Sequence, residues 1–182
     1  ASAERERRRG DVAARELQTF RPKAHWEVTS VNPIGYDKLE AKVDEARSHG
    51  FDVEYVFVDR PPESAWFGGV VKRALSLLKA GKMPRTVNIN VAVKANIRSR
   101  NAALDVLRHR TDLPVRVLDN SQGFDKARLI TDRDEAITYL EKQTYDEASL
   151  LKKLRAETVQ MYRRGEIPAD VAAGLLGEDF MK

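Results

Sequence analysis

The sequence VEYVFV at Val53–Val58, followed directly by Asp59-Arg60-Pro61-Pro62, decides the predicted fold. β-Branched and aromatic residues dominate the first six positions, which is typical of a strand. The two prolines end the strand and open a helix, because proline is tolerated in the first turn of a helix and an acidic residue such as Glu63 favours the helix dipole there. A strand that passes directly into a helix predicts a β–α unit.

Further strands and helices are predicted on both sides of this unit. On the N-terminal side, His25–Val31 has the alternation of a strand, and a helix is expected over about Tyr36–His49. On the C-terminal side, the helix after the prolines runs to about Lys79 and is broken before a second helix begins. The remaining predicted elements are helices at about 87–108, 132–143, 146–163 and 168–176, a strand at 114–119 and a short hairpin strand at 127–130.

This order of elements predicts an α/β fold. Strands separated by helices of ten or more residues form β–α–β units with parallel strands. We therefore expect a three-layer arrangement in which helices flank a mostly parallel sheet, with additional helices at the C-terminus. Leu150, Leu154 and Met161 lie on one stripe of the penultimate helix, which predicts either packing in the core or a surface for a partner.

Length and composition predict one domain. The 182 residues suffice for a single compact domain, which we place at residues 23–182, behind a charged helix or arm at residues 1–22. The chain has no cysteine, which excludes disulfides and thiolate metal sites and predicts a reducing, cytoplasmic location. Its three histidines are scattered, so no metal site is expected. The uncharged run Ser64–Val71 is far shorter than the roughly 20 residues of a membrane span, so no membrane partner is expected either.

The positive charge is concentrated in the middle of the chain. The net charge is +4, but Ser64–Leu104 contains no Asp or Glu and eight basic residues, which leaves −4 for the rest of the chain. A stretch of one sign focuses a positive potential and suits a phosphate-bearing partner. The alternative is a solvated helical face whose charges pair with acidic residues elsewhere. The eight basic residues are Lys72, Arg73, Lys79, Lys82, Arg85, Lys94, Arg98 and Arg100.

Arg73 and Arg85 are the main candidates for phosphate binding. They lie twelve residues apart on either side of a helix break, with Lys72 and Lys82 close to them in sequence. A guanidinium binds two phosphoryl oxygens at once, and phosphoryl transfer depends on cations that offset the charge of the transferred group. The alternative is that they are surface arginines of a solvated helix.

Polar residues at the carboxyl ends of the predicted strands are substrate-side candidates, because ligands of open parallel sheets bind there. Asp59 could bind magnesium or accept a proton from a substrate hydroxyl, or it could bond to the backbone in the Asp-Arg-Pro-Pro turn. Asn32 and Ser30 end the strand before it. Asn32 could hold a ligand or only terminate the strand as part of Asn-Pro.

The phosphate-binding loop of a P-loop kinase is absent from this sequence. That loop reads G-x-x-x-x-G-K-[ST], and its amides, lysine and hydroxyl bind phosphate and magnesium. Gly81-Lys82 lacks the first glycine, and Met83 stands where the hydroxyl would be.

Residues Arg47–Leu107 nevertheless resemble the C-terminal half of the zeta-toxin family. The resemblance rests on Gly50-Phe51-Asp52-Val53 before a strand, on Pro61-Pro62-Glu63-Ser64-Ala65-Trp66-Phe67-Gly68 after it, and on Arg73 followed by Arg85-Thr86. A looser likeness extends it to roughly Trp26–Asp119. Family members are P-loop kinases of toxin–antitoxin systems that typically use ATP to phosphorylate UDP-N-acetylglucosamine.

The resemblance implies that Arg73 and Arg85 contact ATP phosphates, with magnesium as the accompanying ion. It also implies a nucleotide or nucleotide sugar as ligand and an antitoxin or other protein as partner. The family's phosphate loop, its lysine and its catalytic aspartate lie upstream of the matched region, and Ser30-Val31-Asn32 replaces an acidic-Gly-Thr element. The chain is then either a piece of a complete kinase or a descendant that kept the scaffold and lost the catalytic chemistry. In both cases we expect it to be inactive alone.

A binding module without catalysis is the alternative function. In that case the two predicted helices that carry the basic residues between positions 64 and 104 dock on nucleic acid or on an acidic protein. Only Trp66 and Phe67 lie near the basic residues, so the sequence offers few aromatic rings for stacking on single-stranded bases.

Overall fold

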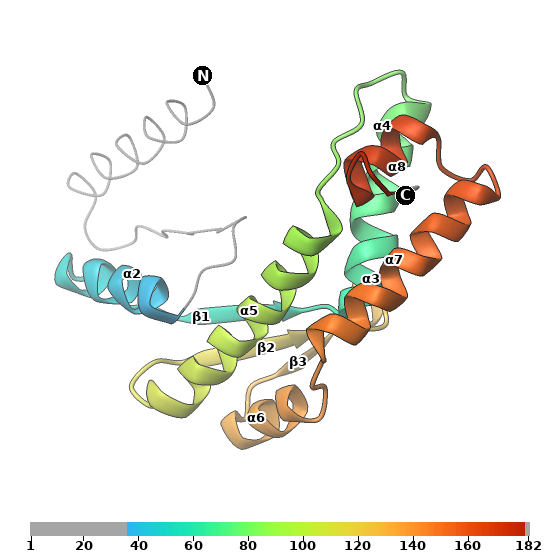
Figure 1. Ribbon diagram of the computed structural model, residues 1–182. Helices are drawn as coiled ribbons and strands as arrows, with labels where there is room; N and C mark the ends of the chain where they lie inside the picture. The colour runs from blue at the N-terminus through green and yellow to red at the C-terminus, as the bar shows by residue number, and fades with distance from the viewer. Residues whose placement is uncertain (1–35, 181–182) are drawn as a thin grey trace. The chain divides into compact units, whose positions relative to one another are not determined.

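The computed structural model describes residues 36–180 (Figure 1). The predicted arm at residues 1–22, the predicted strand His25–Val31 and the candidates Ser30 and Asn32 lie outside the described residues.

The described sheet has three strands in the order β1 (Tyr55–Asp59), β2 (Val115–Asp119) and β3 (Arg128–Ile130). β1 and β2 are parallel, and Asp59 is in register with Asp119. β2 and β3 are antiparallel, as expected for the predicted hairpin, because the short connection between them cannot carry a crossover. The sheet predicted as mostly parallel is therefore mixed in the part of the chain that the structure describes.

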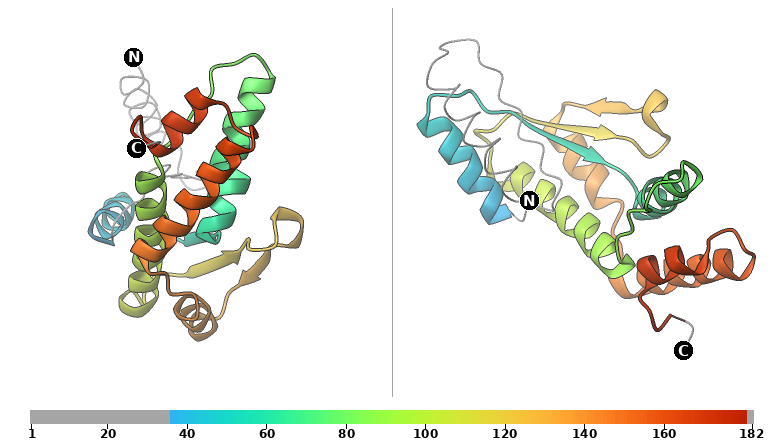
Figure 2. Two further views of the ribbon diagram at one scale, coloured as in Figure 1. Left: turned by 45° about the vertical axis from the view of Figure 1, so that its right-hand side comes forward. Right: turned by 90° about the horizontal axis from the view of Figure 1, so that it is seen from above.

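Helices cover one face of this sheet. α2 (Tyr36–Ser48), the C-terminal half of α5 (Ile89–His109) and α6 (Arg133–Glu141) lie on the same side of the strands (Figure 2). On the other face, Val56, Val58 and Leu129 are about half exposed. The third layer that we predicted is not among the described residues. The core under the helices contains Leu39, Val43, Ala103, Val106, Leu107, Leu113, Val115, Val117, Ile130, Ala136 and Leu140.

A second core is formed by helices alone. α3 (Pro62–Ala65), the π-helical turn η1 (Trp66–Val71) and α4 (Lys72–Lys79) follow one another without a break and pack with α7 (Glu147–Arg163) and α8 (Ala169–Leu176). Trp66 is buried here, and its Nε1 donates to Thr158 Oγ1 at 2.9 Å. Leu150 and Leu154 are buried in this core and Met161 packs against it, as the core interpretation of their stripe predicted.

α5 joins the two cores. Val93 near its N-terminus is buried in the helical core, whereas Ala103 one turn past its middle is buried under the sheet. The helix and strand bounds predicted within residues 36–180 are confirmed to within about three residues, including the helix that opens at the double proline. No helix among residues 36–180 combines the length and the apolar character needed to cross a membrane.

Candidate functional site

The eight basic residues of the central stretch separate into two groups. Arg100 is buried and paired with Asp59, and Lys94 lies 3.9 Å from Glu147. The other six are exposed, and their side chains make no hydrogen bond or ion pair with any described residue. The alternative in which acidic residues neutralise the stretch therefore holds for only two of the eight. We call α4, residues 80–88 and α5 as far as Arg98 the basic helix pair; its unpaired cations are Lys72, Arg73, Lys79, Lys82, Arg85 and Arg98.

The turn after α4 is set by a glycine. Gly81 has φ of 65°, and the amides of Gly81 and Lys82 donate to the carbonyls of Leu78 and Leu77, both at 2.9 Å. This is a Schellman motif, in which glycine adopts the left-handed conformation without steric cost. The motif ends α4 and places Lys82 directly at its C-terminus.

Arg85 lies in a connection that is held at several points. Thr86 packs so closely on α8 that a Cβ atom built on Gly174 would lie 2.3 Å from Thr86 Oγ1. Asn88 then caps α5, since its Oδ1 accepts from the amide of Asn90 at 3.0 Å. Arg73 projects from the first turn of α4 and Arg85 from this returning connection, and both are exposed. The structure thus places the two candidate arginines in the same helix–turn–helix segment with their guanidinium groups free.

Asp59 has a different environment from the one expected for a magnesium ligand. It is 1% exposed; its Oδ1 accepts from Arg100 Nη1 at 2.5 Å and its Oδ2 accepts from the Tyr139 hydroxyl at 2.9 Å. Arg100 also donates to the Leu140 carbonyl at 3.0 Å and lies over the ring of Tyr145, 5.4 Å from its centroid. Both carboxylate oxygens of Asp59 are therefore engaged in holding α5 and α6 to the end of β1.

Two further groups at this end of the sheet have shifted pKa values. Burial alone would raise the pKa of Asp119, but hydrogen bonds with Ser121, including one from its amide at 2.9 Å, outweigh it and the pKa is lowered. Burial, together with the carboxylates of Asp119 and Asp59, holds the pKa of Tyr139 well above its usual range. Tyr139 therefore keeps its hydroxyl proton, which it donates to Asp59.

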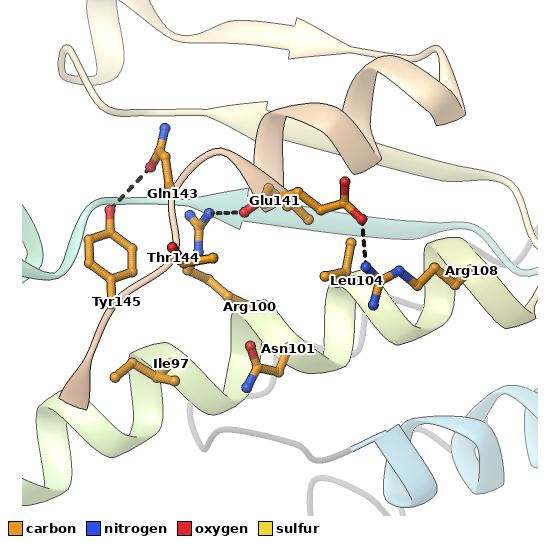
Figure 3. A pocket seen from close by; sticks show the side chains of 10 residues that line it. Ile97, Arg100, Asn101, Leu104, Arg108, Glu141, Gln143, Thr144 and Tyr145 are labelled. Carbon is orange, nitrogen blue, oxygen red and sulfur yellow. Dashed lines mark hydrogen bonds and ion pairs between the residues drawn. The ribbon is translucent and has the colours of Figure 1, made fainter.

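A pocket of about 300 Å³ lies between α5 and the connection from α6 to α7 (Figure 3). Asn101 and Leu104 line it from α5, and Gln143, Thr144 and Tyr145 line it from the connection. The Tyr145 hydroxyl donates to Gln143 at 3.1 Å, and burial raises the pKa of Tyr145. The two arginines that border the pocket, Arg100 and Arg108, already pair with Asp59 and Glu141. The pocket therefore offers little free positive charge, unlike the basic helix pair.

The sequence interpretation overlooked Arg60 and the contacts of Arg100. Arg60 was treated only as part of a turn, although it is the first residue past β1, where ligands of open sheets bind. That position was a usable signal for Arg60. The sequence analysis counts Arg100 only as one of the eight basic residues, although it lies seven residues after Val93 and seven before Leu107, on the buried stripe of α5.

Residues 36–180 contain no cluster of three or more His, Asp or Glu side chains that could hold a metal ion. Comparison of the chain with protein-family models, with curated proteins and with solved structures finds no match.

Proposed function

We propose that this chain is a phosphate-binding module of the zeta-toxin-like kinase type, in which Arg73 and Arg85 contact the phosphates of a nucleotide or nucleotide sugar. The observation that carries the proposal is the set of six exposed cations on the basic helix pair, none of which has a partner among the described residues. An unpaired arginine can use its whole fork of donors for a ligand, whereas a paired arginine must first give up its carboxylate.

The chemistry available at this surface is binding. Guanidinium groups recognise phosphate oxygens in pairs, and lysines such as Lys72 and Lys82 add point charges. Asp59 and Glu63 are the acidic residues that directly precede the basic stretch. The carboxylate of Asp59 accepts hydrogen bonds from Arg100 and Tyr139. We therefore assign it a positioning role for α5 rather than the removal of a substrate proton.

ATP fits this surface better than magnesium does. The cations of the basic helix pair suit phosphate oxygens, but residues 64–104 contain no carboxylate that could bind Mg²⁺. A nucleotide bound here would bring its own magnesium or be neutralised by the arginines. Without loop amides and a loop lysine around the transferred group, the chain alone does not turn over ATP in this proposal.

Calorimetric titration tests the proposal with ATP–magnesium and, separately, with UDP-N-acetylglucosamine. Hydrogen bonds to charged groups contribute about 1.5–3 kcal/mol, so we expect Arg73→Ala and Arg85→Ala each to weaken binding at least about tenfold. Lys126→Ala is the matched control, since it also removes one exposed positive charge but lies in the β2–β3 connection. Equal affinity of both arginine variants and the wild type, or no binding of either ligand, would refute the proposal.

Docking on nucleic acid is the second candidate function. It is favoured by the extent of the basic helix pair, whose free cations run from Lys72 to Arg98 and so exceed what one nucleotide needs. Binding to duplex DNA would then weaken steeply with salt, with a slope of about −5 in a log–log plot if six cations each neutralise one phosphate. A nucleotide site would instead discriminate ATP from AMP. These two titrations separate the two functions.

A further inference from the structure

Arg60 has an unusual position at the end of β1. Its Nε donates to Ser64 Oγ at 3.1 Å, but its two Nη atoms make no hydrogen bond or ion pair with any described residue. The side chain is partly buried rather than extended into solvent. A partly buried guanidinium has lost some of its hydration, and here the two Nη atoms have gained no partner in return, which an anion would supply.

The guanidinium of Arg60 lies against two helical glycines. A Cβ atom built on Gly68 would lie 2.6 Å from Nη2 of Arg60, and one built on Gly69 would lie 3.5 Å from Nη1. These are the only glycines in the continuous helix Pro62–Lys79, and each costs roughly 1 kcal/mol relative to alanine in a helix interior. Any side chain at Gly68 would displace the guanidinium. The glycine at position 68 therefore provides the space in which Arg60 lies.

The same helix face carries two of the free cations. Residues four apart in a helix lie on one face, so Gly68 and Gly69 lie one turn before Lys72 and Arg73. Both glycines belong to η1, and π-helical turns often mark functional sites. Lys72 and Arg73 thus lie one helical turn beyond the two glycines against which the Arg60 guanidinium lies, and residues 64–104 contain no acidic residue.

We infer that Arg60, seated on Gly68 and Gly69, binds one phosphate group of the ligand together with Lys72 and Arg73. The inference rests on the proposed function in assigning the anion to a phosphate-bearing ligand, but it adds a residue that neither the sequence motif nor the family resemblance includes. Its location agrees with the general rule that ligands of open α/β sheets bind beyond the carboxyl ends of the strands.

The test uses inorganic pyrophosphate as probe and calorimetric titration of the whole chain. We expect Arg60→Ala to weaken pyrophosphate binding at least about tenfold and Arg60→Lys to restore it in part, because lysine keeps the charge without the fork of donors. Gly68→Ala is the more discriminating variant, since alanine favours a helix but its methyl group displaces the guanidinium. It should weaken binding without lowering the midpoint of urea unfolding.

The outcomes separate this inference from the proposed function. If Arg73→Ala weakens binding but Arg60→Ala and Gly68→Ala bind as the wild type does, the Arg60 site is refuted and the proposed function stands. If Arg60→Ala, Gly68→Ala and Arg73→Ala weaken pyrophosphate binding but the wild type binds neither ATP–magnesium nor UDP-N-acetylglucosamine, the Arg60 anion site is supported and the proposed function is refuted. If the wild type does not bind pyrophosphate, the Arg60 inference is overturned.

Discussion

Arg100 donates to Asp59 at 2.5 Å, and this ion pair is enclosed where the helical core meets the core under the sheet. Arg100 is 5% exposed and Asp59 is 1% exposed. The pair joins the middle of α5 to the end of β1, and the Tyr139 hydroxyl and the Leu140 carbonyl add a link to α6. The orientation of α5, and with it that of the basic residues in its first half, therefore depends on this contact.

Removing one partner of this pair is expected to destabilise the fold strongly. Arg100→Met leaves the Asp59 carboxylate buried without its counter-charge, for which we expect a loss of about 3–5 kcal/mol in the free energy of unfolding. Urea denaturation measures it. The double variant Asp59→Leu/Arg100→Met should be more stable than Arg100→Met, because no uncompensated charge remains.

The exposed pair Arg116–Glu54 on the sheet serves as control, and Arg116→Ala should cost at most about 1 kcal/mol. A loss below about 1 kcal/mol for Arg100→Met would contradict the role assigned to the buried pair.

The hydrogen bond between Trp66 and Thr158 is expected to stabilise the helical core. Thr158→Val keeps the volume of the side chain but removes the acceptor, which leaves the indole N–H of Trp66 buried and unpaired. We expect a loss of about 1–3 kcal/mol, measured by urea denaturation followed by tryptophan fluorescence. Thr158→Ser retains the hydroxyl and should recover part of this loss. Equal stability of Thr158→Val and the wild type would show that the bond contributes nothing.

The contact between Gly174 and Thr86 should link the stability of α8 to binding by Arg85. A methyl group at Gly174 would overlap Thr86 Oγ1, so Gly174→Ala forces the α4–α5 connection away from α8. We expect an overpacking cost of about 1–3 kcal/mol and weaker ATP binding than in the wild type. Adding Thr86→Ala should relieve part of both effects, because it removes the nearest atom. A Gly174→Ala variant with wild-type stability and affinity would exclude this link.

Stability is expected to fall between pH 10 and pH 12 through Tyr55. Burial raises the pKa of Tyr55 to about 12, whereas the unfolded chain has a tyrosine pKa of about 10. In this interval the unfolded state loses the proton and the folded state keeps it, so the free energy of unfolding decreases as pH rises. Below pH 10 both states are protonated and the contribution is constant.

Tyr55→Phe tests this pH dependence. The variant should show a shallower fall in stability between pH 10 and pH 12 than the wild type does. Absorbance at 295 nm, followed as pH rises, should also show that the folded variant has one fewer tyrosine that ionises near pH 12 than the folded wild type has. Identical pH profiles of the two proteins would contradict the assignment.

Most of the described helices and strands were predictable from the sequence. β1, the helix that opens at Pro62 and the β2–β3 hairpin each carry a local signal: β-branched alternation, a double proline, or two short strands around a turn. Asn88, Asp132 and Asp146 cap helices in the structure, and residues of this type ahead of an apolar pattern are recognised in sequence. These features depend on neighbours within a few residues, so they do not require knowledge of the fold.

The mixed sheet and the burial of Arg100 depend on contacts between different elements and not on neighbours in sequence. The sequence predicts a short hairpin strand at residues 127–130. Its antiparallel pairing with β2 is one of only two strand pairs among the described residues, so the described sheet is not mostly parallel. Arg98 and Arg100 lie two residues apart on α5, yet Arg100 is buried against Asp59 and Arg98 is exposed. The difference arises from the angular position of each residue on α5 relative to β1.

The sequence by itself determined the α/β order of the elements, their approximate bounds and the concentration of positive charge between residues 64 and 104. Periodicity, turn residues and charge are properties of short segments, so they depend only on residues that are close in sequence. Only the tertiary structure decided which of the eight cations stay free, that Asp59 closes a buried ion pair, and that Arg60 lies on Gly68 and Gly69. Each of these depends on groups from different elements meeting in space, and burial and hydrogen bonding then determine which charges are neutralised and which remain available to a ligand.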